Sequence, residues 1–316
     1  MLTSLQPIWI GWGAELTYFY NDPYKSIIGG KHPWALGRPT KEVWSEIWQD
    51  IGPMLDTALG GDQGTFVESQ LLIMERNGYP EETYYTFSYS PIPNDDGTVG
   101  GIICANSDDT QRVIGERQLA LLRDLAADAG HARNWQEACE RSAIALRKNP
   151  RDVPFAMIYI VEPDGSSAVL AGATGIERGS KAAPESIGLG NGSHWPLTEV
   201  IKSQNLEIVS NLQTVFGDDI PSGPWSHPVS QAALVPIAPT GETGRGGVLV
   251  VGLNPFRLFD DNYRSFLSLT AGQILLRRSP TRKLMKKSDG APKPLQNSTA
   301  PRPHFFQMSA TSFAHR

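Results

Sequence analysis

Alternating side chains mark the clearest strand in the first third of the chain. Within residues 81–91, one face carries Thr83, Tyr85, Phe87 and Tyr89, and these alternate with Tyr84, Thr86, Ser88 and Ser90. A period of two is typical of a strand with one buried face. Gly- and Asn-containing turns flank this segment, so we predict a three-stranded antiparallel meander. Its strands are expected at 64–76, 81–91 and 99–106.

The residues before this meander predict a hairpin followed by short helices. Apolar runs at 7–13 and 16–20 are separated by a turn-like break. Further on, Val43, Ile47 and Ile51 repeat at the helical spacing, with Trp44 and Trp48 beside them. This spacing predicts a helix over 39–51 with one wide apolar face. Shorter helices are expected at 24–28 and 53–59.

A long helical stretch over 113–149, with a break near Gly130, follows the meander. Its apolar side chains fall on one side of the helix, and charged residues lie elsewhere. Two interpretations stay open: the stripe pairs with its copy in a dimer, or it packs against its own domain. The stripe consists of Ile114, Leu121, Leu122, Leu125 and Ala129.

The second half of the chain predicts another antiparallel sheet. Buried strands at 153–161 and 168–175 form a hairpin around the turn Pro163-Asp164-Gly165. A short helix at 197–203 precedes strands at 207–209, 231–237 and 248–253, and an amphipathic helix closes the unit at 260–274. We therefore expect an α+β protein of two domains, each a central antiparallel sheet flanked by helices. The expected divisions are a first domain at 1–112, a helical linker at 113–135, a second domain at 136–276 and a disordered basic tail at 277–316.

Charge and cysteine content narrow the classes of function. The tail holds nine of the 28 Lys and Arg residues and one of the 33 Asp and Glu residues, which leaves a body with 19 basic and 32 acidic residues. An acidic body argues against nucleic acid as a partner. Cys104 and Cys139 form no CxxC motif, which argues against a disulfide framework or a zinc site. No apolar run reaches the roughly 18–20 residues that span a bilayer, so we expect a cytoplasmic protein without a membrane partner.

The first domain resembles the PAS domains of bacterial sensor kinases. The resemblance lies in the segments W-G-A-E-L-T-Y-F-Y-N-D-P-Y, G-K-H-P-W-A-L-G-R-P, E-V-W-S-E-I-W and E-E-T-Y-Y-T-F-S-Y-S-P-I, and in the order of the predicted elements. It implies a small-molecule pocket between sheet and helices, although the cofactor is unknown. Aromatic side chains also fill a small core without any ligand, and this alternative stays open. The candidate lining residues are Trp9, Tyr18, Tyr20, His32, Trp44 and Trp48.

The second domain resembles GAF domains, which bind cyclic nucleotides, tetrapyrroles or other small molecules. The segments A-A-L-V-P-I, G-G-V-L-V-V-G-L-N-P and F-D-D-N-Y-R-S-F-L-S-L-T-A-G-Q-I carry the resemblance. No cysteine follows Ala143, so covalent attachment of a bilin is not expected here. The sequence contains no nucleophile–base–acid set, metal cluster or nucleotide fingerprint. We therefore expect no catalytic or metal-binding residues, and no enzyme activity from this chain by itself.

Apolar periodicity ends after Ile274, and the tail decodes in another reading frame. When the third base of each codon is read with the next two bases, Phe306–Arg316 can spell S-D/N-V-S-H-E-F-R-T-P. These letters resemble the phosphoacceptor box of sensor histidine kinases. Leu284–Arg302 can likewise spell a charged helical linker. One hypothesis is a frameshift near Ile274–Leu276 in a sensor kinase gene, and the alternative is a native disordered basic tail.

Two main functions follow from these resemblances. The first is the signal-sensing module of a two-component histidine kinase, which binds a small ligand or a partner and transmits through dimeric helices. The second is a stand-alone dimerising interaction protein or regulator of intact kinases. A homodimer, a small-molecule ligand and intact sensor kinases are thus the expected partners.

Overall fold

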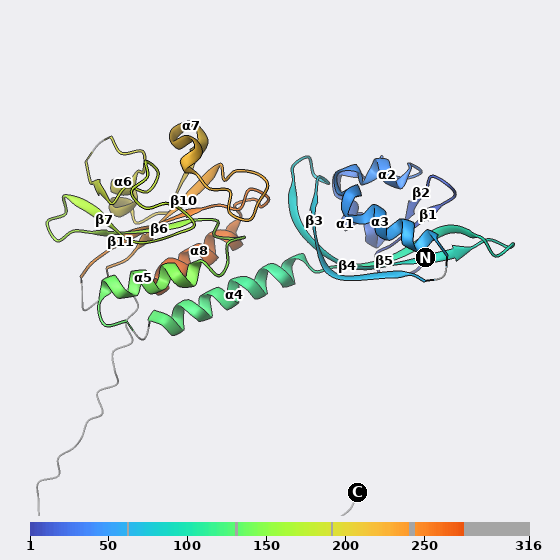
Figure 1. The fold of residues 1–316 in the computed structure, drawn as a ribbon, viewed down its shortest axis with the longest axis horizontal. Coiled ribbons are helices and arrows are strands. Elements are labelled where there is room, and N and C mark those ends of the chain that lie inside the picture. The colour runs from blue at the N-terminus through green and yellow to red at the C-terminus, as the bar shows by residue number, and fades with distance from the viewer. Residues whose placement is uncertain (62, 130–131, 191, 240–243, 275–316) are drawn as a thin grey trace, which may run out of the picture. The chain divides into compact units, whose positions relative to one another are not determined.

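The computed structural model describes the whole chain except residues 62, 130–131, 191, 240–243 and 275–316. The described residues form two antiparallel sheets with flanking helices, so the predicted α+β class is confirmed (Figure 1). The basic tail and the proposed frameshift lie outside the described residues. The domain boundaries stay predictions, but all strands of the first sheet fall within residues 8–108 and all those of the second within 156–252.

The first sheet has the strand order β2-β1-β5-β4-β3, and every neighbouring pair is antiparallel. One face packs against short helices, and side chains from both layers form a single apolar cluster. The predicted hairpin and meander are both present. The strands are β1 (Ile8–Trp12), β2 (Thr17–Tyr20), β3 (Thr65–Met74), β4 (Glu81–Pro93) and β5 (Val99–Asp108), and the helices are α1 (Lys25–Ile28), α2 (Thr40–Val43) and α3 (Trp48–Leu59).

The predicted helix over 39–51 is wrong in its extent. Helix α2 ends at Val43, a 3-10 turn follows at Ser45–Ile47, and α3 begins at Trp48 and runs through Pro53. The break falls at Trp44, whose indole is buried and donates a hydrogen bond to the Tyr18 hydroxyl at 2.9 Å. Core packing of this ring therefore overrides the local helical periodicity.

The second sheet has the strand order β8-β7-β6-β11-β10-β9, again antiparallel throughout. Apolar clusters cover both of its faces, because the central strands β6 and β11 are buried on either side. Strand β8 and helix α7 are additions to the prediction. The strands are β6 (Ala156–Val161), β7 (Ser167–Thr174), β8 (Ser186–Gly188), β9 (Glu207–Ser210), β10 (Gln231–Ile237) and β11 (Gly247–Gly252); the short helices are α6 (Leu197–Ser203) and α7 (Leu212–Phe216).

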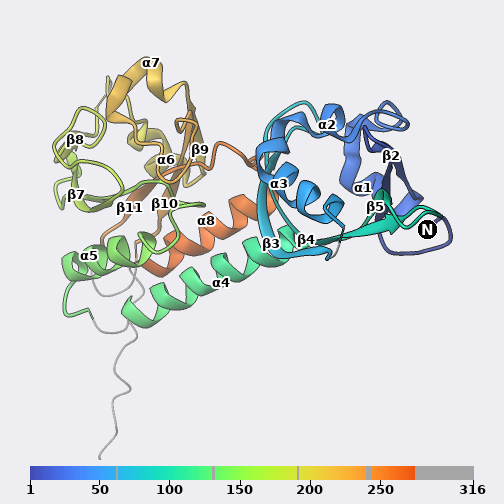
Figure 2. The ribbon, with the colours of Figure 1, turned by 45° about the vertical axis from the view of Figure 1, so that its right-hand side comes forward.

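Three longer helices accompany the second sheet: α4 (Thr110–Ala129), α5 (Trp135–Leu146) and α8 (Asp261–Ile274) (Figure 2). The helical stretch predicted over 113–149 thus consists of two helices, α4 and α5, and Asn134 caps α5 by accepting a hydrogen bond from the Glu137 amide at 2.8 Å. Leu121 and Leu125 of the linker stripe are buried in the same cluster as side chains of α5 and α8. This part of the stripe therefore packs against its own chain, as the second interpretation expected. Among the described helices, none has the length and apolarity needed to cross a bilayer.

Candidate functional site

A small cavity lies in the core of the first domain, between α3 and strands β3 to β5. Its volume is about 30 Å³. Of the six residues predicted from sequence, Trp9 and Trp44 line it. Most of its wall comes from residues that the sequence analysis did not select: Tyr24, Ile27, Ile47, Ile51, Leu72, Met74, Tyr85, Phe87, Tyr89 and Asn106.

The other predicted residues lie around this cavity without lining it. Tyr18 is fully buried, and its hydroxyl donates to the Tyr24 hydroxyl at 2.7 Å. Tyr20 and His32 pair with each other, with 2.9 Å between the phenol oxygen and Nδ1. Trp48 is half-buried and packs at the edge of the apolar cluster. The six residues are thus neighbours, and two of them line this cavity.

The cavity is apolar with a few polar groups at its wall. Burial raises the pKa of Tyr24 well above its usual value, so the phenol stays neutral. Its oxygen accepts from Tyr18, and its own O–H is left as a donor. A volume of this size holds one or two water molecules. A larger molecule would enter only if lining side chains moved.

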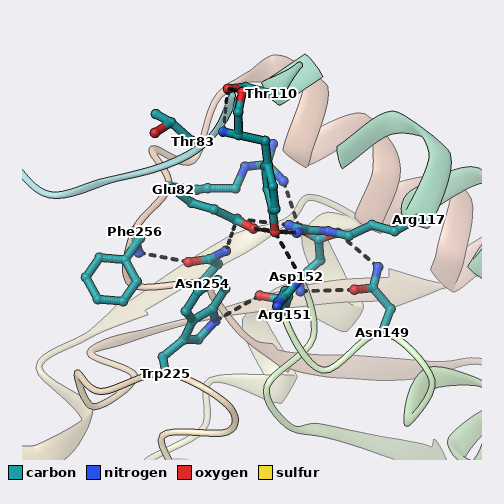
Figure 3. Close-up of polar contacts among 12 residues, drawn as sticks. Glu82, Thr83, Thr110, Arg117, Asn149, Arg151, Asp152, Trp225, Asn254 and Phe256 are labelled. Atoms are coloured by element: carbon teal, nitrogen blue, oxygen red, sulfur yellow. Dashed lines mark hydrogen bonds and ion pairs between the residues drawn. The ribbon is translucent and has the colours of Figure 1, made fainter. Parts of the chain in front are cut away.

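A second, more polar feature joins the two domains through helix α4, and the sequence analysis did not detect it (Figure 3). Its first member is Glu82, near the start of β4. The Glu82 side chain is fully buried, and its backbone N–H donates to the carbonyl of Phe256 at 2.8 Å. Asn254 donates through Nδ2 to Glu82 Oε2 at 2.7 Å. Residues of the second domain therefore hold the strand and the carboxylate of the first.

Arg117 of α4 lies between two buried carboxylates. Its Nη2 donates to Glu82 Oε2 at 2.9 Å and to Asp152 Oδ1 at 2.6 Å, and its Nε donates to Asp152 Oδ2 at 2.8 Å. Its Nη1 contacts Glu82 Oε1 and donates to the Tyr84 hydroxyl at 3.0 Å. All five guanidinium N–H groups are thereby used. Burial alone would lower the pKa of Arg117, but the hydrogen bonds and charges of both carboxylates raise it above its ordinary value.

Asp152 anchors the cluster in the second domain. Its carboxylate also accepts from Asn149 Nδ2 at 2.9 Å and from Arg257 Nη1 at 2.8 Å. Burial pushes the pKa of Asp152 upward, but the hydrogen bonds and charges of Arg117 and Arg257 prevail and hold the pKa below its usual value. The carboxyl is therefore ionised at neutral pH. Two carboxylates face two guanidinium groups, so the numbers of acidic and basic side chains are equal. We call Glu82, Arg117, Asp152 and Arg257 the junction cluster.

Two tyrosines extend the junction cluster to its neighbours. The Tyr84 hydroxyl donates to Glu82 Oε1 at 2.7 Å and accepts from Arg151 at 3.1 Å. Burial, followed by the adjacent Glu82 carboxylate, raises the pKa of Tyr84 to about 12. On α8, the Tyr263 hydroxyl donates to the backbone carbonyl of Asp152 and accepts from the backbone N–H of Asn254 at 3.2 Å. The cluster therefore contacts β4, α4 and α8.

Cys104 and Cys139 are buried free thiols, and burial raises the pKa of each. Within the part of the chain that the structure describes, no group of three or more His, Cys, Asp or Glu side chains is arranged to hold a metal ion.

No family model matches the sequence, and no curated protein is detectably similar to it. Solved structures similar to the chain include GAF and PAS domains and free methionine-R-sulfoxide reductases. The GAF domain of an Acinetobacter phosphoenolpyruvate-protein phosphotransferase is 17% identical, with a TM-score of 0.37, and the match covers 50% of this chain and 90% of that one. A PAS domain from Colwellia psychrerythraea is 14% identical, with a TM-score of 0.29 and coverages of 35% and 92%.

A sensory box sensor histidine kinase from Vibrio cholerae is 18% identical to the chain, with a TM-score of 0.26 and coverages of 34% and 80%. At such low identities, similarity concerns the fold and does not identify a ligand or an activity.

Proposed function

We propose that this chain is the sensory region of a cytoplasmic two-component histidine kinase, without a catalytic activity of its own. In this proposal, the first domain receives a small ligand or a partner, and the second domain and its helices carry the signal to an output domain encoded further along the gene. The GAF and PAS resemblances of the sequence support the sensory role. The observation that carries the proposal is that one strand, β4, contributes side chains both to the cavity and to the junction cluster.

Strand β4 has one face toward the cavity and the other toward the second domain. Tyr85, Phe87 and Tyr89 line the cavity. Glu82 and Tyr84 have the opposite parity and enter the junction cluster. Successive side chains of a strand point to opposite faces, so a displacement of β4 by a bound molecule changes both surfaces. This arrangement supports communication between a binding event and the second domain.

The kinase context can be tested by resequencing the gene across codons 270–316 and about a kilobase beyond from a fresh isolate. We expect that restoring one base near codon 275 opens a frame through S-H-E-F-R-T-P into an ATP-binding domain. A confirmed stop after codon 316, with no kinase frame downstream, would refute the kinase assignment. The tail would then be native, and the interaction-protein alternative would replace it.

That alternative, a dimerising interaction protein, is supported by a groove between α4 and α8. The groove has a volume of about 430 Å³, and Leu119 and Leu269 on its walls are 59% and 56% exposed. Such apolar side chains on adjacent helices suit a second copy of the chain. Sedimentation equilibrium of the purified chain should then give a dimer mass that Leu119→Lys reduces to a monomer. A monomer at micromolar concentration would exclude this dimer.

A further inference from the structure

We propose that the junction cluster is a conformational latch that transmits the state of β4 to helix α8. This inference rests on the proposed sensory function and names its route of transmission. In the closed form described above, Arg117 holds Glu82 and Asp152 together. In the open form, the Glu82 contact is lost, and α8 is released from the constraint that Asp152 places on it.

The contact between Glu82 and Arg117 has few intermediate states. The side chains of Glu82 and Asp152 are fully buried and share one guanidinium group, that of Arg117. A buried carboxylate that loses its partner is strongly unfavourable, whereas a paired one is tolerated. Glu82 therefore either stays paired with Arg117 or moves far enough to reach water. A bistable contact of this kind is what a switch requires.

A change in the cavity reaches the latch through the backbone of β4. Phe87 lines the cavity, and Glu82 lies five residues earlier on the same strand. The backbone N–H of Glu82 is bound by Phe256 of the second domain, as described above. A shift of β4 that accommodates an enlarged cavity therefore pulls on the contacts of Glu82 with Asn254 and Arg117.

A change in the latch reaches α8 through the contacts of Asp152. Tyr263 is fully buried, and its hydroxyl binds the Asp152 carbonyl and the Asn254 amide. The Asn254 side chain also donates to Glu82, and Arg117 links Glu82 to Asp152, so both residues that bind Tyr263 are connected to Glu82. Arg257, which also binds Asp152, lies four residues before the first residue of α8. The start of α8 is thus held directly by the latch.

Energetics favour a signalling role over a purely stabilising one. Replacing a buried ionic cluster by apolar side chains of similar size is often neutral or stabilising. The cluster is therefore a weak source of stability, although removing one member is costly. Its distinctive property is that it fixes one arrangement of β4, α4 and α8.

Amide hydrogen exchange of the full chain, followed by mass spectrometry, tests the latch. Four forms are compared: the parent chain, Phe87→Leu, Arg117→Met and the double variant. Phe87→Leu enlarges the cavity, and we expect it to accelerate exchange in the peptide covering 261–274 about tenfold in the parent chain. In the Arg117→Met background the same substitution should leave exchange of that peptide nearly unchanged. Arg123→Met, an exposed position on the same helix, is the matched control and should preserve the response.

Two results would overturn the latch. One is an equal response of residues 261–274 to Phe87→Leu with and without Arg117, and the other is a response confined to the first domain. If Arg117→Met does not fold, Glu82→Gln replaces it, because the amide keeps the shape and removes the charge. Loss of the latch would leave the proposed sensory function standing, since the reading frame tests that function independently.

Discussion

Replacing Arg117 by Met is expected to lower the free energy of unfolding by about 3–5 kcal/mol, the range measured when one partner of a buried ion pair is removed. Glu82 and Asp152 have fully buried side chains, and both lose their shared partner in this variant. Asp152 is still paired with the charged Arg257. Glu82 is left with neutral hydrogen-bond donors such as Tyr84 and Asn254. The uncompensated charge at Glu82 is therefore the main cause of the loss.

Urea denaturation monitored by circular dichroism measures this loss. Arg123→Met removes the same side chain from an exposed position on α4 and should change stability by less than about 0.5 kcal/mol. The double variant Glu82→Leu, Arg117→Met should recover part of the loss, because it removes the lone buried carboxylate and leaves Asp152 paired with Arg257. If Arg117→Met is as stable as Arg123→Met, the junction cluster does not join the domains as described.

Replacing Trp44 by Ala is the second change with a large expected effect, a loss of about 3–5 kcal/mol. Trp44 is 2% exposed and lines the cavity of the first domain. Its indole N–H binds the Tyr18 hydroxyl, and the Lys31 ammonium lies 4.4 Å from its ring centroid. The substitution therefore removes apolar contacts, a hydrogen bond and a cation–π contact, and it enlarges the cavity.

Added indole should restore part of the stability of Trp44→Ala. A ligand that binds the folded state at ten times its Kd stabilises it by about 1.4 kcal/mol, and indole matches the removed ring. Thermal unfolding with and without indole measures the effect. Trp12→Ala is the control, because Trp12 is 44% exposed, and it should show a small loss and no rescue. Failure of indole to stabilise Trp44→Ala would mean that the first domain closes over the space and does not accept a planar ligand.

The cavity illustrates how far the sequence leads toward a site. The alternation in 81–91 predicted that Tyr85, Phe87 and Tyr89 share a buried face, and the structure confirms it. The pocket residues expected from the sequence were nevertheless Trp9, Trp44 and four aromatic neighbours. Periodicity indicates which face of a strand is buried, but it does not reveal which other element packs on that face.

Such local patterns in the sequence do not predict the junction cluster. Glu82 lies 35 residues before Arg117, which lies 35 residues before Asp152, and Asn254 is 172 residues from Glu82. In the sequence, Glu82 is one charged residue at the start of a strand, and Arg117 is one of several basic residues on a helix. The sequence did contain one signal, because the charged Glu82 directly precedes the alternating aromatic residues of β4. It becomes interpretable once the partner charges are known.

By itself, the sequence determined the two antiparallel sheets, the two hairpins, the meander and the closing helix, because periods of 2 and 3.6 and turn residues act over a few positions. The tertiary structure decided where α2 ends, which aromatic side chains surround the cavity, and that Glu82, Arg117 and Asp152 meet in one buried cluster. These features depend on contacts between residues far apart in the chain. Their energies come from burial and charge pairing, which exist only once the two domains and α4 have packed together.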